Sequence, residues 1–404
     1  MKNLQLLAGT AVIDITPPLE VGLLTSAVKG EYASFTSVRL PLKARILVLQ
    51  SGEKKVAIIS MDLLSLNDTS VGGWDNFKRG LAGQLDPENI ILTYTHTHCA
   101  PESGAVTSLY LTEEFKTWLK GVQSNVREAI HEACSVFKPC TVELTHQVLE
   151  GYSLQRRIKK DNVVVMSDSL QPIPPDLMNG QPIDRRVIAI SLVNEKNTIA
   201  TIVHAACHPV HEMCMRHVSS DFPGEMCRRL EENGSFGMPM FLNGAAGDVN
   251  PPTVSLGPEY SKQHGYALAD LVATSRSKMY KGDSSFAFAT YQQQFTIRED
   301  SGVSNTADGI ARISVIKLGD IALVFLPGEP FTETALQIEK ESPFAHTIIL
   351  GFSENNIGYI PTAEAFRDGG YEVGPGKWSF IQEDADQIVQ ARAVRLLKDL
   401  YQQP

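Results

Sequence analysis

The sequence is short of several features that mark common classes of protein. It has six cysteines among 404 residues, and none of them forms a C-x-x-C pair. Such sparse cysteine use is typical of a reduced, intracellular protein and argues against a disulfide framework. No apolar run approaches the about 20 residues that a membrane-spanning helix needs. The formal net charge of −10 argues against a protein that binds nucleic acids or anionic membranes through a basic face.

The N-terminal stretch lacks the form of a signal peptide. Its apolar residues are few, and Gln5 and Gly9 interrupt them. The segment also continues into residues 11–18, which have the pattern of a strand followed by a Pro-Pro turn. We therefore predict no signal peptide and a cytoplasmic location.

Three well-known catalytic motifs are also missing. The sequence has no H-E-x-x-H zinc motif, no Walker motif and no G-x-S-x-G nucleophile elbow. The glycine-rich turn at Gly244–Gly247 has neither the Rossmann spacing nor the lysine of a phosphate-binding loop.

Strand-like and helix-like segments alternate along the chain. Runs rich in Val, Ile and Leu predict strands at 43–49, 56–60, 89–94, 141–149, 187–193, 200–206, 238–242, 286–295, 310–317, 321–327 and 347–352. Helical periodicity predicts helices at 113–134, 221–233, 260–279, 332–341 and 383–401. The alternation predicts an α/β fold with mixed sheets flanked by helices and buried on both faces.

The domain organisation is predicted to be simple. No linker interrupts residues 1–404, so we expect one domain, with a β-rich part near 284–314. Residues 158–184 are rich in Pro, Asp, Asn and Ser and are expected to form a long loop or lid. The glycine-rich segment 369–376 is expected to be a loop that contributes to a pocket wall.

Histidines stand at the ends of two predicted strands. His96 and His98 follow the strand at 89–94, and a spacing of two residues would point both to one face if the strand continued. His208 follows the strand at 200–206, whereas His204 lies within it and is expected to be structural. In α/β sheets, sites form where the carboxyl ends of strands meet.

Other strand ends add acidic and polar residues. Asp248 and Asn250 follow a turn of small residues, Glu329 follows a Pro-Gly turn, and Tyr359 lies in the loop after 347–352. Two imidazoles and a carboxylate make a common catalytic zinc set. The residues alone leave open a metal site, a cysteine nucleophile (Cys99 or Cys207) beside a histidine, or polar strand ends without chemistry.

Seven motifs, taken in order, resemble the neutral/alkaline (non-lysosomal) ceramidase family. They span about residues 8–400, and the same order by chance would be rare. The motifs are Ala11-x-x-Asp14-Ile15-Thr16-Pro17-Pro18, Thr95-His96-Thr97-His98-x-x-Pro101, His208-Pro209, Ser219-Ser220-Asp221-Phe222-Pro223-Gly224, Asn243-Gly244-Ala245-Ala246-Gly247-Asp248-Val249-Asn250-Pro251, Leu326-Pro327-Gly328-Glu329 and Gly358-Tyr359.

This resemblance implies a catalytic-domain-like fold and a site that holds one Zn²⁺. The ligands carried over by motif are His96, His208, Glu329 and Tyr359. It also implies that His98 lines the reaction centre and that Arg156 takes the place of an arginine in an Asn-Arg motif. Here Gln155 stands where the family has that asparagine.

The sequence departs from the family at two points. Ceramidases have a serine in a Gly-Asp-Val-Ser-Pro-Asn segment, and Asn250 replaces it here. An amide donates and accepts hydrogen bonds but is neither a nucleophile nor a base. The family also has a C-terminal immunoglobulin-like domain, which we do not expect after the helix at 383–401.

The leading hypothesis is a zinc-dependent hydrolase that cleaves an amide bond of a small or lipid-like substrate with metal-activated water. His98 is the candidate for proton transfer or oxyanion stabilisation, Arg156 would supply positive charge, and Asn250 would orient substrate or water. The alternatives are an esterase or lactonase, a true ceramidase, and a homologue that binds metal or ligand without catalysis.

Overall fold

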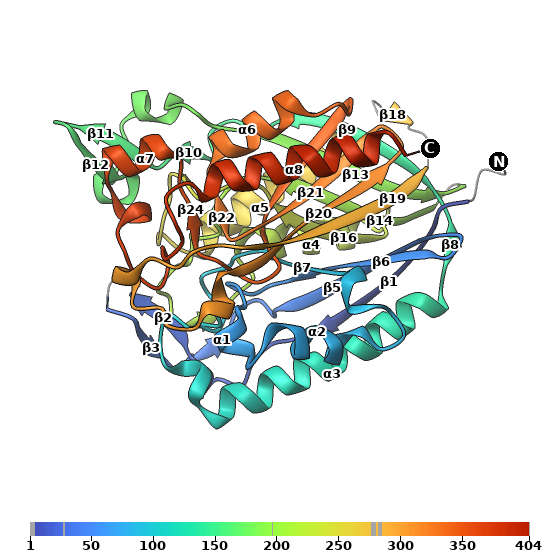
Figure 1. Ribbon diagram of the computed structural model, residues 1–404, viewed down its shortest axis with the longest axis horizontal. Helices are drawn as coiled ribbons and strands as arrows, with labels where there is room; N and C mark the ends of the chain where they lie inside the picture. The colour runs from blue at the N-terminus through green and yellow to red at the C-terminus, as the bar shows by residue number, and fades with distance from the viewer. Residues whose placement is uncertain (1–4, 27–28, 196, 276–279, 282–284, 404) are drawn as a thin grey trace.

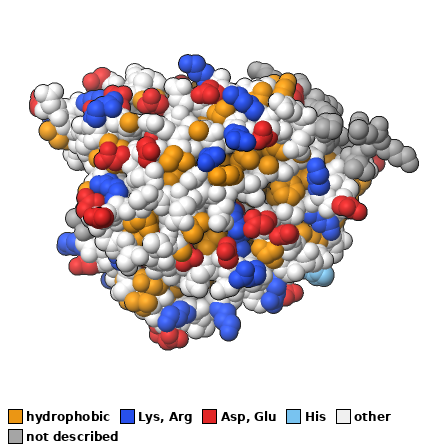
Figure 2. Space-filling view, in the orientation of Figure 1, with side chains coloured by type: hydrophobic (Ala, Val, Ile, Leu, Met, Phe, Trp, Pro, Cys, Tyr) orange, Lys and Arg blue, Asp and Glu red, His pale blue; other side chains and the backbone are white. Residues whose placement is uncertain are grey.

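The computed structural model describes residues 5–26, 29–195, 197–275, 280–281 and 285–403. Two β-sheets are stacked on each other, and helices cover their outer faces (Figure 1). Basic and acidic side chains are interspersed over the face seen in Figure 2. None of the described helices combines the length and the apolar character needed to cross a membrane.

The larger sheet has nine strands in the order β19-β20-β21-β23-β7-β6-β5-β1-β8. It is mixed, because β6 pairs with β7 and β21 with β23 in parallel, whereas the other neighbours are antiparallel. Its strands are β1 (Leu7–Asp14), β5 (Lys43–Ser51), β6 (Lys54–Met61), β7 (Ile90–Tyr94), β8 (Lys138–Pro139), β19 (Phe286–Gln294), β20 (Ile310–Leu318), β21 (Ile321–Pro327) and β23 (His346–Ser353).

The smaller sheet has five strands in the order β16-β14-β13-β9-β18. Only β14 and β16 are parallel, so the segments after both strands leave the sheet at the same end. The strands are β9 (Thr141–Val148), β13 (Arg186–Asn194), β14 (Asn197–Ala205), β16 (Met238–Asn243) and β18 (Tyr280–Lys281).

Short strands pair locally outside the two sheets and shape the loops at one end of the molecule. The pairs are β2 (Leu23–Ser26) with β3 (Glu31–Ala33), β4 (Ser37–Val38) with β15 (His217–Val218), β10 (Leu154–Gln155) with β17 (Val249–Asn250), β11 (Arg157–Lys160) with β12 (Val163–Met166), and β22 (Glu329–Pro330) with β24 (Tyr359–Ile360).

Apolar side chains fill the space between the sheets and the space under each helix layer. Leu47, Ile58, Ile190 and Met240 belong to the core between the two sheets. The helices that cover the outer faces are α3 (Glu113–Ser135), α4 (Asp221–Asn233), α5 (Pro258–Ser275), α6 (Thr332–Glu341) and α8 (Ala385–Tyr401). Because both faces of the central strands, such as β5, β7, β16 and β21, are covered, these strands have near-continuous apolar sequences rather than an alternating pattern.

The structure confirms the predicted α/β class with mixed sheets flanked by helices. It also corrects details. The segment 158–184 is not a plain loop, since most of the β11–β12 hairpin and two 3₁₀ turns lie in it. The strands expected near 284–314 form the edge of the larger sheet rather than a separate part. Residues 276–279 of the helix expected at 260–279, and residue 284, lie outside the described residues.

Three short helices have no predicted counterpart: α1 (Asp68–Val71), α2 (Trp74–Ala82) and α7 (Ala363–Asp368). Their length hides the helical period, because each makes fewer than about three turns. α2 nevertheless carries Lys78, whose ammonium is buried and donates to both Glu354 oxygens at 2.8 and 3.1 Å and to the carbonyl of Ile90 at 2.5 Å.

Replacing Lys78 by methionine is expected to lower the free energy of unfolding by about 3–5 kcal/mol, because the buried Glu354 loses its counter-charge. The double variant Lys78→Met with Glu354→Leu should recover most of that loss. Urea unfolding monitored by circular dichroism measures both changes. Equal stability of the single variant and the wild type would contradict the structural importance of this pair.

Candidate functional site

Four residues that lie just after a strand or at the start of one come together at one buried position. His96 follows β7, His208 follows β14, Glu329 begins β22 and Tyr359 begins β24. β22 and β24 pair in parallel, and Glu329 and Tyr359 are direct neighbours across this pair. Residues separated by more than 100 positions in the chain are thereby brought together by the two sheets.

The two histidines after β7 come together in a way that strand alternation does not explain. β7 ends at Tyr94, and His96 has a positive φ of 68°. A non-glycine residue in this left-handed region costs about 1–3 kcal/mol and is common at functional sites. The ring centroids of His96 and His98 are 5.0 Å apart. The expected proximity is therefore found, but a turn produces it rather than a continued strand.

Backbone carbonyls orient the rings of His96 and His208. Nδ1 of His96 lies 2.7 Å from the carbonyl of Leu64, and Nδ1 of His208 lies 2.7 Å from the carbonyl of Ala246 and 3.1 Å from that of Val249. A carbonyl only accepts hydrogen bonds, so each Nδ1 carries the proton and each neutral ring leaves a lone pair on Nε2. This is the usual arrangement around metal-binding histidines.

The two Nε2 atoms face one carboxylate oxygen. Oε2 of Glu329 lies 3.1 Å from Nε2 of His208 and 3.5 Å from Nε2 of His96. Burial lowers the pKa of both histidines well below the usual range and raises the pKa of Glu329. Three electron-rich atoms this close repel one another unless a cation or a proton lies between them. The donor set therefore fits a metal ion, and it is the set that catalytic zinc prefers.

His98 belongs to the same cluster. One possible ligand atom from each of His96, His98 and His208 lies within 4.8 Å of the others. Burial, together with the neighbouring His208 and the charge of Arg156, lowers the pKa of His98 to about 3, so its ring is neutral. Its Nε2 is buried and has no hydrogen-bond partner among the described residues. The cluster thus offers two overlapping sets of three donors, which share His96 and His208 and differ in His98 or Glu329.

Tyr359 lies opposite Glu329 in the β22–β24 pair. Its hydroxyl interacts with Glu329 and with Arg156, and burial raises its pKa well above the usual range. The guanidinium carbon of Arg156 lies 5.3 Å from the centre of the Tyr359 ring. All four residues expected to bind zinc are therefore buried and interconnected.

Arg156 and Asn250 lie together beside His208. Nη1 of Arg156 is 3.3 Å from Oδ1 of Asn250 and 3.4 Å from Nε2 of His208. The β10–β17 pair brings them together, since Leu154 lies opposite Asn250. Gln155, which replaces the asparagine of the family motif, donates to Oδ2 of Asp248 at 2.8 Å and so ties β10 to the small-residue turn.

Two further residues touch the cluster and were not singled out from the sequence. The Phe352 ring packs on His96 with a centroid distance of 4.3 Å. Glu372, in the expected pocket-wall loop, accepts a hydrogen bond from Nε of Arg156 at 2.8 Å. No sequence signal distinguishes Glu372 from the other glutamates. The glycines near it in the sequence indicate only a loop.

The cysteine alternative is not supported by the surroundings of the thiols. Cys99 Sγ donates to the carbonyl of Glu212 at 2.7 Å, and Cys207 Sγ lies 3.8 Å from the carbonyl of Tyr152. Burial raises the pKa of both thiols well above the usual range. Because the thiolate is the nucleophile, thiols held in this way are inert.

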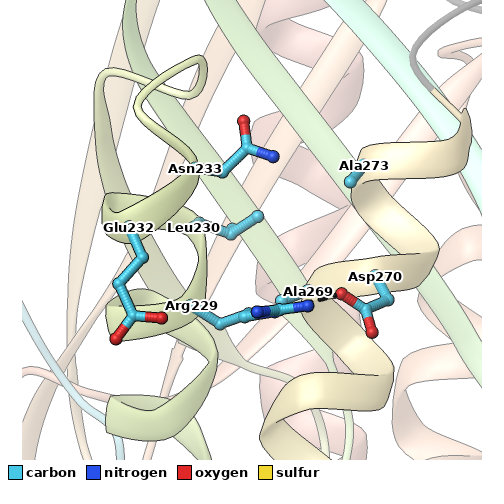
Figure 3. Close-up of a pocket in the computed structure, with 7 residues that line it drawn as sticks. All are labelled: Arg229, Leu230, Glu232, Asn233, Ala269, Asp270 and Ala273. Carbon is cyan, nitrogen blue, oxygen red and sulfur yellow. Dashed lines mark hydrogen bonds and ion pairs between the residues drawn. The ribbon is translucent and has the colours of Figure 1, made fainter.

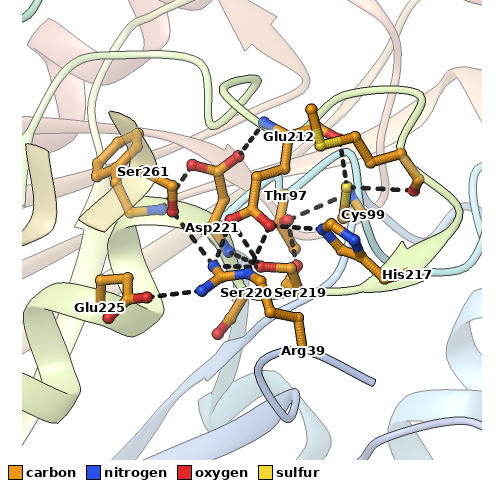
Figure 4. A network of polar contacts seen from close by, with 12 residues as sticks. Arg39, Thr97, Cys99, Glu212, His217, Ser219, Ser220, Asp221, Glu225 and Ser261 are labelled. Atoms are coloured by element: carbon orange, nitrogen blue, oxygen red, sulfur yellow. Dashed lines mark hydrogen bonds and ion pairs between the residues drawn. The ribbon is translucent and has the colours of Figure 1, made fainter. Parts of the chain in front are cut away.

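A polar network centred on Arg39 joins the two histidine loops (Figure 4). Nε of Arg39 donates to Glu212 at 2.6 Å, and Nη1 donates to Glu225 at 2.8 Å. Thr97, between the two histidines after β7, donates to the carbonyl of Ser219 at 2.7 Å. The loop with His96 and the loop after His208 are therefore held in register by buried hydrogen bonds.

One open hollow on the surface lies apart from this cluster. Figure 3 shows one of about 180 Å³ between α4 and α5, where Arg229 and Asp270 are 3.3 Å apart. None of its lining residues belongs to the histidine cluster. The case for the candidate site therefore rests on the chemistry of its side chains.

Comparison with solved structures identifies the fold. The chain is similar to the neutral ceramidase from Pseudomonas aeruginosa, with a TM-score of 0.78, 16% identity and coverage of 99% of this chain and 75% of that chain. It is similarly close to a structure described as ceramidase complexed with C2, with a TM-score of 0.78, 14% identity and coverage of 99% and 76%. No protein-family model and no curated protein matches the sequence.

The buried carboxyl of Asp221 should make stability depend on pH. Burial, with the nearby Glu212 carboxylate, raises the pKa of Asp221 to about 7. Between about pH 4 and pH 7 the folded protein keeps this proton while the unfolded chain releases it, so the free energy of unfolding falls as the pH rises. Asp221→Asn cannot release a proton, and its stability should fall less over this window.

Urea unfolding of both proteins at pH 5 and pH 8, in the presence of a chelator, measures this difference. Changes common to both proteins, such as titration of the histidine cluster, cancel in the comparison. The same pH dependence in Asp221→Asn and in the wild type would show that Asp221 is ionised throughout.

Proposed function

We propose that the protein is a zinc-dependent hydrolase that cleaves an amide bond of a small or lipid-like substrate. The observation that carries the proposal is the convergence of two neutral imidazole nitrogens on one buried carboxylate oxygen, at 3.1 and 3.5 Å. We assign His96, His208 and Glu329 as ligands, with Tyr359 as the fourth, within a single domain of residues 1–404. Zinc bound there would lower the pKa of a water molecule to about 7 and polarise a carbonyl group.

Glu329 is preferred over His98 as the third ligand for two reasons. Its Oε2 lies 3.1 Å from Nε2 of His208 and 3.5 Å from Nε2 of His96. Its negative charge also offsets the charge of a divalent ion, which a third imidazole would not do. His98 then keeps a free Nε2 beside the site, and it can accept a proton or a hydrogen bond from a reacting group.

Arg156 and Asn250 complete the proposed site. The guanidinium of Arg156 is permanently charged and can stabilise negative charge that develops on a carbonyl oxygen during amide cleavage. Because Arg156 has no acceptor atom, the amide of Asn250 must present Oδ1 to it, and its NH₂ group is directed elsewhere. Asn250 then serves as a hydrogen-bond donor that orients substrate or water, and no covalent intermediate forms on it.

The substrate is proposed only by class. The two solved structures named above are described as ceramidases, which favours amide over ester cleavage. Their identity to this chain is 14–16%, and one fold hosts many reactions. Asn250 in place of the family serine favours a substrate other than ceramide.

Removing the metal should abolish hydrolysis. Treatment with a chelator is expected to stop cleavage of an amide panel, and added Zn²⁺ should restore it. His208→Ala and Glu329→Ala should lose most of their zinc and lower the rate by at least about a thousandfold, because zinc supplies both the nucleophile and the carbonyl polarisation. Metal analysis and initial rates measure these effects.

His146→Ala is the matched control, since His146 is an exposed residue of β9, contacts His346 at 3.3 Å and does not belong to the histidine cluster. It should keep its zinc and its activity. Full hydrolysis by zinc-free protein would overturn the proposal. Zinc binding without hydrolysis of any amide or ester would favour the non-catalytic alternative.

Asn250→Ala should be a milder variant than His208→Ala. Loss of one orienting hydrogen bond is expected to lower kcat by about ten- to a hundredfold without loss of zinc. The measurement is kcat together with zinc content, with Cys99→Ala as a control that leaves the rate unchanged. A rate as low as that of His208→Ala, with zinc still bound, would assign Asn250 a larger chemical role.

A further inference from the structure

Glu372 lies fully buried between two arginines that are adjacent in the sequence. Its Oε1 accepts a hydrogen bond from Nε of Arg156 at 2.8 Å, and its Oε2 accepts one from Nη1 of Arg157. One carboxylate therefore serves two guanidinium groups, each through a different oxygen. The carboxylate belongs to the 3₁₀ turn Tyr371–Val373, far in sequence from both arginines.

The contact with Glu372 determines where the rest of the Arg156 guanidinium points. A guanidinium is planar and rigid, so holding Nε fixes the direction of both Nη atoms. Nη1 then faces Asn250 and His208 at 3.3 and 3.4 Å. Nη2 is buried, and the part of the chain that the structure describes offers it no partner with hydrogen-bond geometry, although the Tyr359 hydroxyl interacts with the guanidinium group. A buried unpaired donor of this kind is a place for an oxygen atom of a ligand.

Arg157 fixes the loop that carries Glu372. Its Nη2 donates to the carbonyl of Gly369 at 2.6 Å and lies 3.4 Å from the carbonyl of Ala365. Gly370 has a φ of 105°, and a Cβ there would lie 2.9 Å from Nη1 of Arg157. Glycine is required by both the backbone conformation and the close approach of the arginine. The loop is thus anchored to β11, and this anchor sets the position of Glu372.

We propose that Glu372 is a positioning residue for the reaction, which holds the Arg156 guanidinium so that its Nη edge faces the substrate position beside the histidine cluster. The proposal rests on the proposed hydrolase function for its kinetic part. Its structural part, the orientation of Arg156 by Glu372, stands independently of any activity or bound metal.

The structural part is tested by NMR of the arginine Nε–H groups in the full chain. The wild type should show a slowly exchanging Nε–H resonance that disappears in Arg156→Lys and is thereby assigned to Arg156. Glu372→Gln should shift that resonance and speed its exchange. A resonance that is unchanged in Glu372→Gln would overturn the proposal.

The kinetic part is tested by a double-mutant cycle with Arg156→Met. Glu372→Gln is expected to lower kcat by about ten- to a hundredfold, with zinc content retained and KM changed by less than about threefold. In the Arg156→Met background the same substitution should change kcat by less than about threefold, because Glu372 acts through Arg156. Effects that multiply in the double variant would overturn the proposal.

Glu354→Gln is the control for a general loss of stability, since it removes the partner of the buried Lys78 without touching either arginine. It should lower the melting temperature but leave kcat and the Arg156 resonance unchanged. A fall in kcat equal to that of Glu372→Gln would show that lost stability alone explains the effect. If the wild type hydrolyses no amide, the proposed function fails, and the NMR result alone decides whether Glu372 holds Arg156.

Discussion

The central constraint on this molecule is the repulsion between three electron-rich atoms in a buried place. Nε2 of His96 and Nε2 of His208 meet Oε2 of Glu329 without a proton on either nitrogen, because backbone carbonyls occupy both Nδ1–H groups. Such an arrangement is stable only with a cation or a proton between the three atoms. The stacked sheets make it possible, since β7, β14 and β21 all end near this point and hold the loops that carry the three residues.

Charged groups near the site support this arrangement through their partners. Arg39 pairs with Glu212 after His208 and with Glu225 of α4, and Thr97 ties the His96 loop to the same network. Arg156 is paired with Glu372 and presents its Nη edge to His208. A buried charge without a partner costs free energy, so each charged side chain stays next to its partner. Each pair therefore fixes the positions of its two side chains as well as neutralising their charges. The site is rigid because the hydrogen bonds and ion pairs around it leave each side chain few alternative conformations.

The likeness of the fold and the identity of the residues at the site support different conclusions. The likeness to two solved ceramidases at a TM-score of 0.78 establishes the architecture, whereas 14–16% identity does not transfer a substrate. Asn250 lies within hydrogen-bond reach of Arg156. Its amide can form hydrogen bonds but offers no hydroxyl, so the proposed hydrolysis would depend on the groups around the histidine cluster.

The sequence by itself determined the fold class, the positions of nearly all long strands and helices, and the polar residues at the strand ends, since apolar periodicity and short motifs are local signals. It could not supply the partner of Arg156 or the shape of the turn at His96. Strand alternation predicted the meeting of His96 and His98 for the wrong reason, because the strand stops at Tyr94. Only the tertiary structure decided that Glu372, more than 200 residues away, orients Arg156, because contacts of that range depend on how the sheets and loops pack and leave no pattern in the sequence.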